Sequence, residues 1–212
     1  MLDFTKKIAI FGIGGLAKDV FFCLKEIYLK GHYAFDGQVV FVDKLPNKSA
    51  FFLNCPLFLE ENFDSRAYQV IIAIGNPKIR KQISISLPAA TFYPKVIHPS
   101  ALVNETVILG KGVVILANAI ISCDVTVGDF CILDRAAQIG HDCMVADFVH
   151  FSPASVLSGN VTINSLVDIG THAAIKQNLE VERETIIGMG AIVVKSILEK
   201  GVYVGNPAKK MK

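Results

Sequence analysis

Two histidines and two aspartates stand close together in IGHDCMVADFVHF, residues 139–151, a segment that is otherwise mostly apolar. Within it, His141 is followed directly by Asp142. An imidazole gains and loses a proton near neutral pH, and a carboxylate that contacts it can hold one tautomer in place. Such a pair can act as a general base. The alternative is a histidine that is merely solvated, and the choice depends on where the side chain points.

The elements that position this pair are indicated by a repeat of six residues. From Ile97 to Val193, every sixth residue is Ile, Val, Leu or Phe, without exception over seventeen positions. Four places after each of these anchors stands a small or aliphatic residue, and only Ser155 and Thr185 are polar there. Neither the period of a helix nor the alternation of an ordinary strand keeps this register.

A chain that turns a corner every six residues explains the repeat. Three hexads form one coil, so the repeat predicts nearly six coils stacked into a triangular prism about 25 Å tall. Anchors and small residues face inward, and we expect the glycines that often follow an anchor to provide the corner conformation. His141 lies two places after its anchor, outside both inward columns, so it is expected to point outward. Asp142 can contact it only if the chain turns there, which Gly140 favours.

The first ninety residues show a different pattern, in which apolar runs of strand type alternate with helical spacing. Strands are expected within 6–15, 38–43 and 69–75, and helices within 16–30 and 76–87. This alternation predicts a small parallel sheet with its ligand at the carboxyl ends of the strands.

A glycine turn ends the first of these strands. Gly12-x-Gly14-x-x-Ala17 fits the loose dinucleotide fingerprint, and Asp43 ends the next strand, where an acid that binds a ribose belongs. The region is too short for a complete dinucleotide fold, and NAD binding and a purely structural turn are the alternatives. We favour another nucleotide diphosphate, held by backbone N–H groups at the helix N-terminus.

The composition argues against several classes of protein. The formal net charge is +2 and no long Lys or Arg run occurs, which disfavours nucleic-acid binding. The first residues have a strand pattern, and neither a signal peptide nor a membrane span is expected. The five cysteines form no CxxC pair, so we expect free thiols and a cytoplasmic protein.

The whole chain resembles the hexapeptide-repeat bacterial sugar acyltransferases, which include UDP-4-amino-sugar N-acetyltransferases and sialic acid O-acetyltransferases. The motifs that carry the resemblance are IFGIGGLAKDV, FVD, AIGNPKIRKQI, GHDCMVADFVHFSPASVLSGNV and GVYVGNPAKKM. The resemblance implies an α/β Rossmann-like domain at 1–90 for the nucleotide sugar and an all-β left-handed parallel β-helix at 91–212 for acetyl transfer. It also implies acetyl-CoA as co-substrate, a role in glycan biosynthesis and assembly into a homotrimer.

The resemblance assigns roles to individual residues. The nucleotide sugar is expected at Gly14, Gly15, Leu16, Asp43, Lys44 and Gly75. Leu16 stands where the family often has histidine, and Lys44 stands where a second acid can occur, so the nucleobase and the sugar stay open.

In the β-helix, the resemblance makes His141 the catalytic histidine and Asp142 its orienting acid. His150 is expected against the thioester of acetyl-CoA, with a surface histidine as the alternative. Thr171 and Met189 match positions that line the pantetheine arm, and Met189 replaces a glycine of relatives.

The expected activity is acetyl-CoA-dependent N-acetylation of the amino group of a nucleotide-linked sugar. The amine attacks the thioester directly while His141 accepts its proton, without a covalent acetyl-enzyme. O-acetylation of sialic acid or of another sugar hydroxyl is the alternative reaction, and a non-catalytic trimeric scaffold is the alternative class. Zinc is not expected, because His141, His150 and His172 lack the close pair seen in carbonic anhydrases with this prism.

Overall fold

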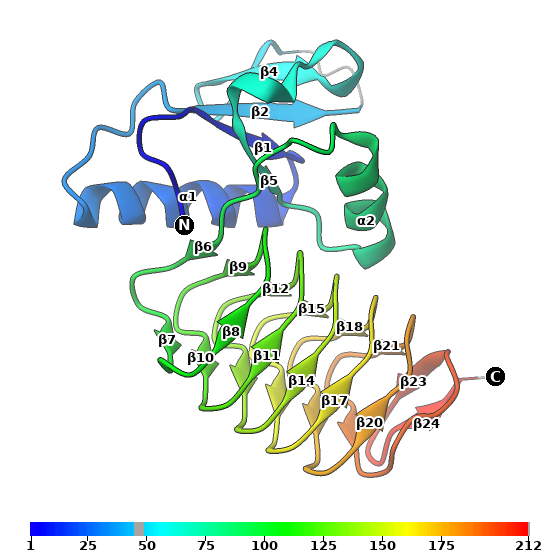
Figure 1. The fold of residues 1–212 in the computed structure, drawn as a ribbon. Coiled ribbons are helices and arrows are strands. Elements are labelled where there is room, and N and C mark those ends of the chain that lie inside the picture. The colour runs from blue at the N-terminus through cyan, green and yellow to red at the C-terminus, as the bar shows by residue number, and fades with distance from the viewer. Residues whose placement is uncertain (45–48, 212) are drawn as a thin grey trace.

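The computed structural model describes residues 1–44 and 49–211, and it shows a small α/β part resting on a β-helical prism (Figure 1). The α/β part contains, in chain order, β1 (Ile8–Phe11), α1 (Gly15–Lys30), β2 (Val39–Asp43), β3 (Phe51–Phe52), β4 (Cys55–Leu59), the 3-10 turns η1 (Glu60–Asn62) and η2 (Ser65–Ala67), β5 (Gln69–Ile72) and α2 (Pro77–Ser86). Its sheet has the order β3-β4-β2-β1-β5, and only β3 and β4 are antiparallel. The predicted strands and helices are confirmed, with their ends moved by a few residues, whereas β3 and β4 were not predicted.

The rest of the described chain winds into the prism as very short strands. These are β6 (Val96–Ile97), β7 (Leu102–Val103), β8 (Ile108–Leu109), β9 (Val114–Ile115), β10 (Ile120–Ile121), β11 (Thr126–Val127), β12 (Ile132–Leu133), β13 (Gln138–Ile139), β14 (Met144–Val145), β15 (His150–Phe151), β16 (Val156–Leu157), β17 (Thr162–Ile163), β18 (Asp168–Ile169), β19 (Ala174–Ile175), β20 (Glu180–Val181), β21 (Ile186–Ile187), β22 (Ile192–Val193), β23 (Val202–Val204) and β24 (Lys209–Lys210). In a typical pair, Gln138 of β13 lies beside Val156 of β16, eighteen residues later and in parallel. This register confirms three hexads per coil.

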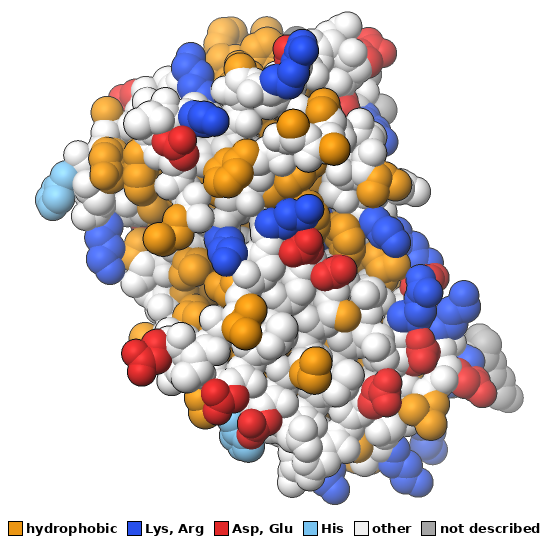
Figure 2. Space-filling view, in the orientation of Figure 1, with side chains coloured by type: hydrophobic (Ala, Val, Ile, Leu, Met, Phe, Trp, Pro, Cys, Tyr) orange, Lys and Arg blue, Asp and Glu red, His pale blue; other side chains and the backbone are white. Residues whose placement is uncertain are grey.

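The strands form three sheets, one on each face of the prism. Face one contains β6, β9, β12, β15, β18 and β21 and continues into β23 and β24; face two contains β7, β10, β13, β16, β19 and β22; face three contains β8, β11, β14, β17 and β20. In cross-section the corner between faces two and three therefore lies opposite face one. Figure 2 shows that charged side chains of both signs gather at the C-terminal end of the prism, while hydrophobic side chains stand singly on the side toward the viewer.

From Ile115 onward the anchors are buried as predicted, whereas the first anchor, Ile97, is 36% exposed. Ile139 and Phe151 are 2% and 0% exposed and belong to one continuous buried cluster. The small column is buried as well, including Ser155 and Thr185, whose hydroxyl groups have no hydrogen-bond partner among the described residues. Burying aliphatic side chains removes apolar area from water and is the main stabilising contribution in this part of the chain.

The corners are built differently from the expectation. A left-handed backbone occurs three places after the anchor, with φ between 55° and 65° at Asn118, Asp124, Phe130, Ala136, Asp142, Phe148, Ala154, Asn160, Leu166, His172, Asn178 and Glu184. The glycine directly after an anchor has another function. A Cβ on Gly140 would lie 2.7 Å from the carbonyl carbon of Ser158 on the next coil. The prediction that these glycines form the corners was wrong, because glycine is needed there for close packing between coils.

The α/β part covers the first coils of face one (Figure 1). The outward residues Val96, Val114 and Ile132 are at most 1% exposed and share a buried cluster with residues of β1 and α1. The row continues along the face with His150 and then Asp168. These two residues therefore stand where the covered coils end.

Arg80 of α2 joins the two parts of the chain. Its side chain is only 1% exposed. The guanidinium donates hydrogen bonds of 2.6–3.3 Å to five backbone carbonyls, those of Ile74, Gly75, Phe130, Phe148 and Val149. Burial lowers the pKa of Arg80 to about 10. The turn after β5 and two coils of the prism are thus held by one side chain.

Candidate active site

His141 and Asp142 form a hydrogen-bonded pair at the corner between faces two and three. The Nδ1 atom of His141 lies 2.7 Å from Oδ2 of Asp142. A carboxylate can only accept, so the proton of this bond is on Nδ1, and Nε2 of the neutral ring carries a lone pair. The two side chains are 62% and 59% exposed. The pair therefore points outward and is accessible, as the hexad register predicts.

The corner conformation makes this contact possible. Asp142 has a φ of 58°, which turns its carboxylate back toward the ring, whereas neighbouring side chains on a straight strand point apart. Backbone hydrogen bonds hold the corner to both adjacent coils. The N–H of Asp142 donates to the carbonyl of Cys123 at 3.2 Å, and the N–H of Asn160 donates to the carbonyl of His141 at 2.8 Å. The chain turns here as expected, but Asp142 makes the turn and Gly140 does not.

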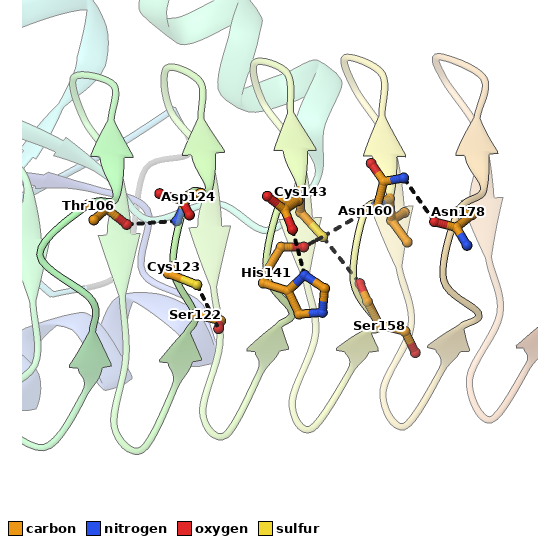
Figure 3. Close-up of polar contacts among 11 residues, drawn as sticks. Thr106, Ser122, Cys123, Asp124, His141, Cys143, Ser158, Asn160 and Asn178 are labelled. Atoms are coloured by element: carbon orange, nitrogen blue, oxygen red, sulfur yellow. Dashed lines mark hydrogen bonds and ion pairs between the residues drawn. The ribbon is translucent and has the colours of Figure 1, made fainter.

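The imidazole of His141 occupies space that the absence of a side chain at Gly159 leaves open. Gly159 occupies the same corner position as His141 on the next coil, and a Cβ there would lie 2.5 Å from both Cε1 and Nε2 of the ring. The ring therefore lies over the glycine, in the direction of Ser158 in Figure 3. Any larger side chain at position 159 would displace it.

Two cysteines flank this corner in different ways. Cys123 occupies the corner position on the preceding coil and is half-buried (Figure 3). Cys143 points into the prism, where burial raises the pKa of its thiol and where the thiol contacts the carbonyls of His141 and Ser158. Of the two, only Cys123 has a partly accessible side chain.

His150 lies on face one and beneath the turn that follows β5. Its Nδ1 atom is 3.2 Å from Oδ1 of Asp168, and its side chain is 13% exposed. A Cβ on Gly75 would lie 3.2 Å from Cε1 of the ring, so the turn packs directly on the histidine. A surface histidine, the alternative expected from the sequence, does not describe this residue.

The other two expected coenzyme residues lie at the corner between faces one and two. Thr171 follows β18 and Met189 follows β21, one coil apart. The side chain of Met189 is 77% exposed. His150, Thr171 and Met189 thus share one side of the prism, whereas His141 lies at the corner opposite face one. Within one chain the structure does not bring His141 together with these three residues.

The residues expected to bind the nucleotide sugar line the carboxyl edge of the sheet. Gly14 precedes α1, Gly15 and Leu16 are the first two residues of α1, Asp43 ends β2 and Lys44 follows it, and Gly75 lies between β5 and α2. The chain itself does not require glycine at the start of α1. Neither Gly14 nor Gly15 has a positive φ, and nothing lies within 4 Å of a Cβ at either position.

Metal ligands do not gather in the part of the chain that the structure describes. Within residues 1–44 and 49–211, no three His, Cys, Asp or Glu side chains are arranged to hold a metal ion. The five cysteines are free. Neither α1 nor α2 is long and apolar enough to cross a bilayer, and the described residues form no other α-helix.

Three residues of this site were not predicted from the sequence. Gly159 and Asp168 each stand eighteen residues after a histidine, so the coil register was a usable signal for both. Arg80 carried no such signal, because an arginine in a short helix is usually solvated. Only the packing of α2 on the prism reveals its role.

Comparison with known proteins agrees with this architecture. Residues 7–87 match the family model of the PglD N-terminal domain. The acetyltransferase domain of PglB from Neisseria gonorrhoeae FA1090 is 32% identical with a TM-score of 0.87, covering 97% of this chain and 100% of that one. That domain has also been solved with acetyl coenzyme A.

Two further structures share the whole architecture. A mutant of perosamine N-acetyltransferase from Caulobacter crescentus is 27% identical with a TM-score of 0.85 over 97% of both chains, and was solved with CoA and GDP-perosamine. WeeI from Acinetobacter baumannii AYE has the same fold, with a TM-score of 0.88 at 24% identity over 97% of this chain and 100% of that one.

A Rossmann-like sheet set on a six-residue-repeat prism, with an outward histidine–carboxylate pair, is the arrangement of an acyltransferase. Its similarity to the Neisseria domain extends over nearly the whole chain. The chain belongs to the hexapeptide-repeat family of bacterial sugar N-acetyltransferases.

Proposed function

We propose that the protein transfers the acetyl group of acetyl-CoA to the amino group of a sugar linked to a nucleoside diphosphate. The observation that carries the proposal is the 2.7 Å bond between Nδ1 of His141 and the carboxylate of Asp142 at an accessible corner. The ligands of two relatives support it: the Neisseria domain binds acetyl coenzyme A, and the Caulobacter enzyme binds CoA and GDP-perosamine.

In the proposed reaction, the sugar amine attacks the carbonyl carbon of the thioester. A C–N bond forms, the C–S bond breaks, and the sulfur of coenzyme A leaves. The attacking nitrogen must lose a proton, which Nε2 of His141 accepts and can return to the leaving sulfur. Asp142 keeps the ring in the reactive tautomer and stabilises the charge that the ring gains. No acetyl-enzyme forms.

The start of α1 is the proposed diphosphate site. Free N–H groups and the positive end of the helix dipole attract anions at a helix N-terminus. Since the chain does not need glycine at Gly14 and Gly15 for its own packing, glycine there leaves room for a ligand to reach the backbone. In this proposal Asp43, which ends β2, binds the ribose, and Lys44 and Gly75 also contact the nucleotide sugar.

The proposed site needs two chains. The expected coenzyme residues His150, Thr171 and Met189 lie on one side of the prism, and His141 lies at the corner away from face one. A neighbouring chain can place its His141 corner against this side, and threefold closure satisfies all chains equally. We therefore propose a homotrimer with three active sites between subunits. The free cysteines support the reducing cytoplasm as its location, where sugar precursors for glycans are made.

A substrate panel tests the proposal. The protein is incubated with acetyl-CoA and UDP- or GDP-linked amino sugars, and the products are weighed by mass spectrometry. Sialic acid and nucleotide sugars without an amino group serve as controls. We expect one acetyl group on the amino sugars only. Acetylation confined to hydroxyl groups would contradict the proposed N-acetylation. Binding of the coenzyme without any acetyl transfer would favour the alternative, a non-catalytic scaffold.

A further inference from the structure

His150 and Asp168 form a second histidine–carboxylate pair, unlike the first in its surroundings. The residues are neighbours across β15 and β18, one coil apart, with Nδ1 and Oδ1 separated by 3.2 Å. Their side chains are 13% and 33% exposed, whereas those of His141 and Asp142 are 62% and 59% exposed. The second pair is therefore enclosed, in the place where the α/β part meets face one.

The pairing determines which ring nitrogen carries the proton. A carboxylate accepts hydrogen bonds, so Nδ1 of His150 must donate, and Nε2 of the neutral ring has a lone pair. Nε2 is buried and has no hydrogen-bond partner among the described residues. A buried polar atom without a partner is costly, and such an atom in a site is usually satisfied by a ligand or an ordered water.

Nε2 lies beside Gly75, at the edge of the sheet where the nucleotide sugar is expected to bind. A Cβ on Gly75 would lie 3.8 Å from Nε2 and 3.2 Å from Cε1. Arg80 donates to the carbonyl of Gly75 on one side and to that of Val149, the residue before His150, on the other. Arg80 consequently fixes the position of the turn after β5 relative to the ring of His150.

Asp168 also interacts electrostatically with Arg80. The buried guanidinium of Arg80 has only backbone carbonyls as hydrogen-bond partners among the described residues. The negative charge of Asp168 attracts it and partly offsets the burial that lowers the pKa of Arg80. Asp168 thus has two roles at this junction, since it also accepts from His150.

We propose that Asp168 is a positioning residue that holds His150 in the Nδ1–H tautomer, so that Nε2 accepts a hydrogen bond from an N–H or O–H group of the nucleotide-linked sugar. The inference rests on the proposed function and changes the expected role of His150. A thioester carbonyl has only lone pairs and cannot bond to an unprotonated Nε2. An amino or hydroxyl group of a sugar can.

The tautomer is tested by NMR of the imidazole nitrogens at pH 8, where an ordinary imidazole is neutral. In the wild-type protein, Nδ1 of His150 should be protonated and Nε2 should not. Asp168→Asn can donate as well as accept, and it should produce a mixture of tautomers. The matched control is Asp129→Asn, which changes a carboxylate that caps the backbone N–H of Lys111 elsewhere on the prism. An Nε2–H tautomer in the wild type would overturn the proposal.

Kinetics identify the ligand. Asp168→Asn should raise the KM for the nucleotide amino sugar several-fold, up to about tenfold for the loss of one hydrogen bond, with the KM for acetyl-CoA unchanged. A rise confined to acetyl-CoA would make His150 a coenzyme contact and overturn the inference. The NMR measurement needs no substrate, so its failure is distinct from failure of the proposed function, which would show as an absence of acetylation.

Discussion

His141 and Gly159 face each other on neighbouring coils, and the ring occupies the volume that a side chain at position 159 would fill. A Cβ on Gly159 would lie 2.5 Å from Nε2, the nitrogen proposed to accept the proton. The direction of the proposed base therefore depends on a residue without a side chain.

Gly159→Ala should lower kcat by up to about 100-fold, the scale of a misplacement of about 1 Å at a reacting group. The free energy of unfolding should change by less than about 1 kcal/mol, because an exposed ring can swing aside. Steady-state kinetics and thermal unfolding measure the two effects. Ser158→Ala, the neighbouring substitution, is the control and should keep its kcat. An unchanged kcat in Gly159→Ala would mean that the ring position does not matter.

Gly15→Val tests the proposed diphosphate site. Valine fits the chain itself, since nothing lies within 4 Å of a Cβ at this position. A bound diphosphate would collide with the isopropyl group, so the KM for the nucleotide sugar should rise by about tenfold or more, the equivalent of about 1.4 kcal/mol. The KM for acetyl-CoA should stay the same. An equal rise for both substrates would argue against separate sites.

Cys123→Ala tests direct transfer. This thiol lies one coil from His141 and is the cysteine at this corner that an acetyl-enzyme would use, so near-normal turnover in the variant is expected. Alkylation followed by mass spectrometry gives a second check. Burial raises the pKa of Cys23 and of Cys131 to about 12, so both should stay unmodified in the native protein at pH 8. Acetylated Cys123 after incubation with acetyl-CoA alone would contradict direct transfer.

Mixed trimers test the site between subunits. His141→Ala removes the base from one wall, and Met189→Trp blocks the opposite wall at a side chain that is 77% exposed. Each variant alone should be inactive, while refolded mixtures should recover part of the activity, because some sites combine two intact walls. Gly188→Trp is unsuitable as a block, since a Cβ there would lie 2.7 Å from Val204. A fully active monomer in sedimentation would contradict the shared site.

Much of the fold was predictable because one spacing repeats through it. The six-residue register places Ile139 inside, His141 outside and Cys143 inside, and the structure confirms all three. The β3–β4 hairpin was missed because its turn uses Leu53 and Asn54 at φ 48° and 60°, without the usual glycine.

The rest of the site depends on contacts between distant segments. Asp168 and Gly159 follow from the eighteen-residue coil only after the coil is known. Arg80 is different, because nothing local distinguishes a buried arginine from a solvated one. Its five carbonyl partners come from the turn after β5 and from two coils that lie 50 to 69 residues later.

The central claim is that His141 is the base in an acetyl transfer to a sugar amine, and the most direct measurement is the turnover of His141→Ala. With acetyl-CoA and a UDP- or GDP-linked amino sugar that the wild type acetylates, we expect turnover at least ~100-fold lower, the usual scale for losing a general base. Asp142→Asn should lose less, because Asp142 orients the ring and does not accept the proton. Circular dichroism should show an unchanged fold. Near-normal turnover by folded His141→Ala would contradict the assignment.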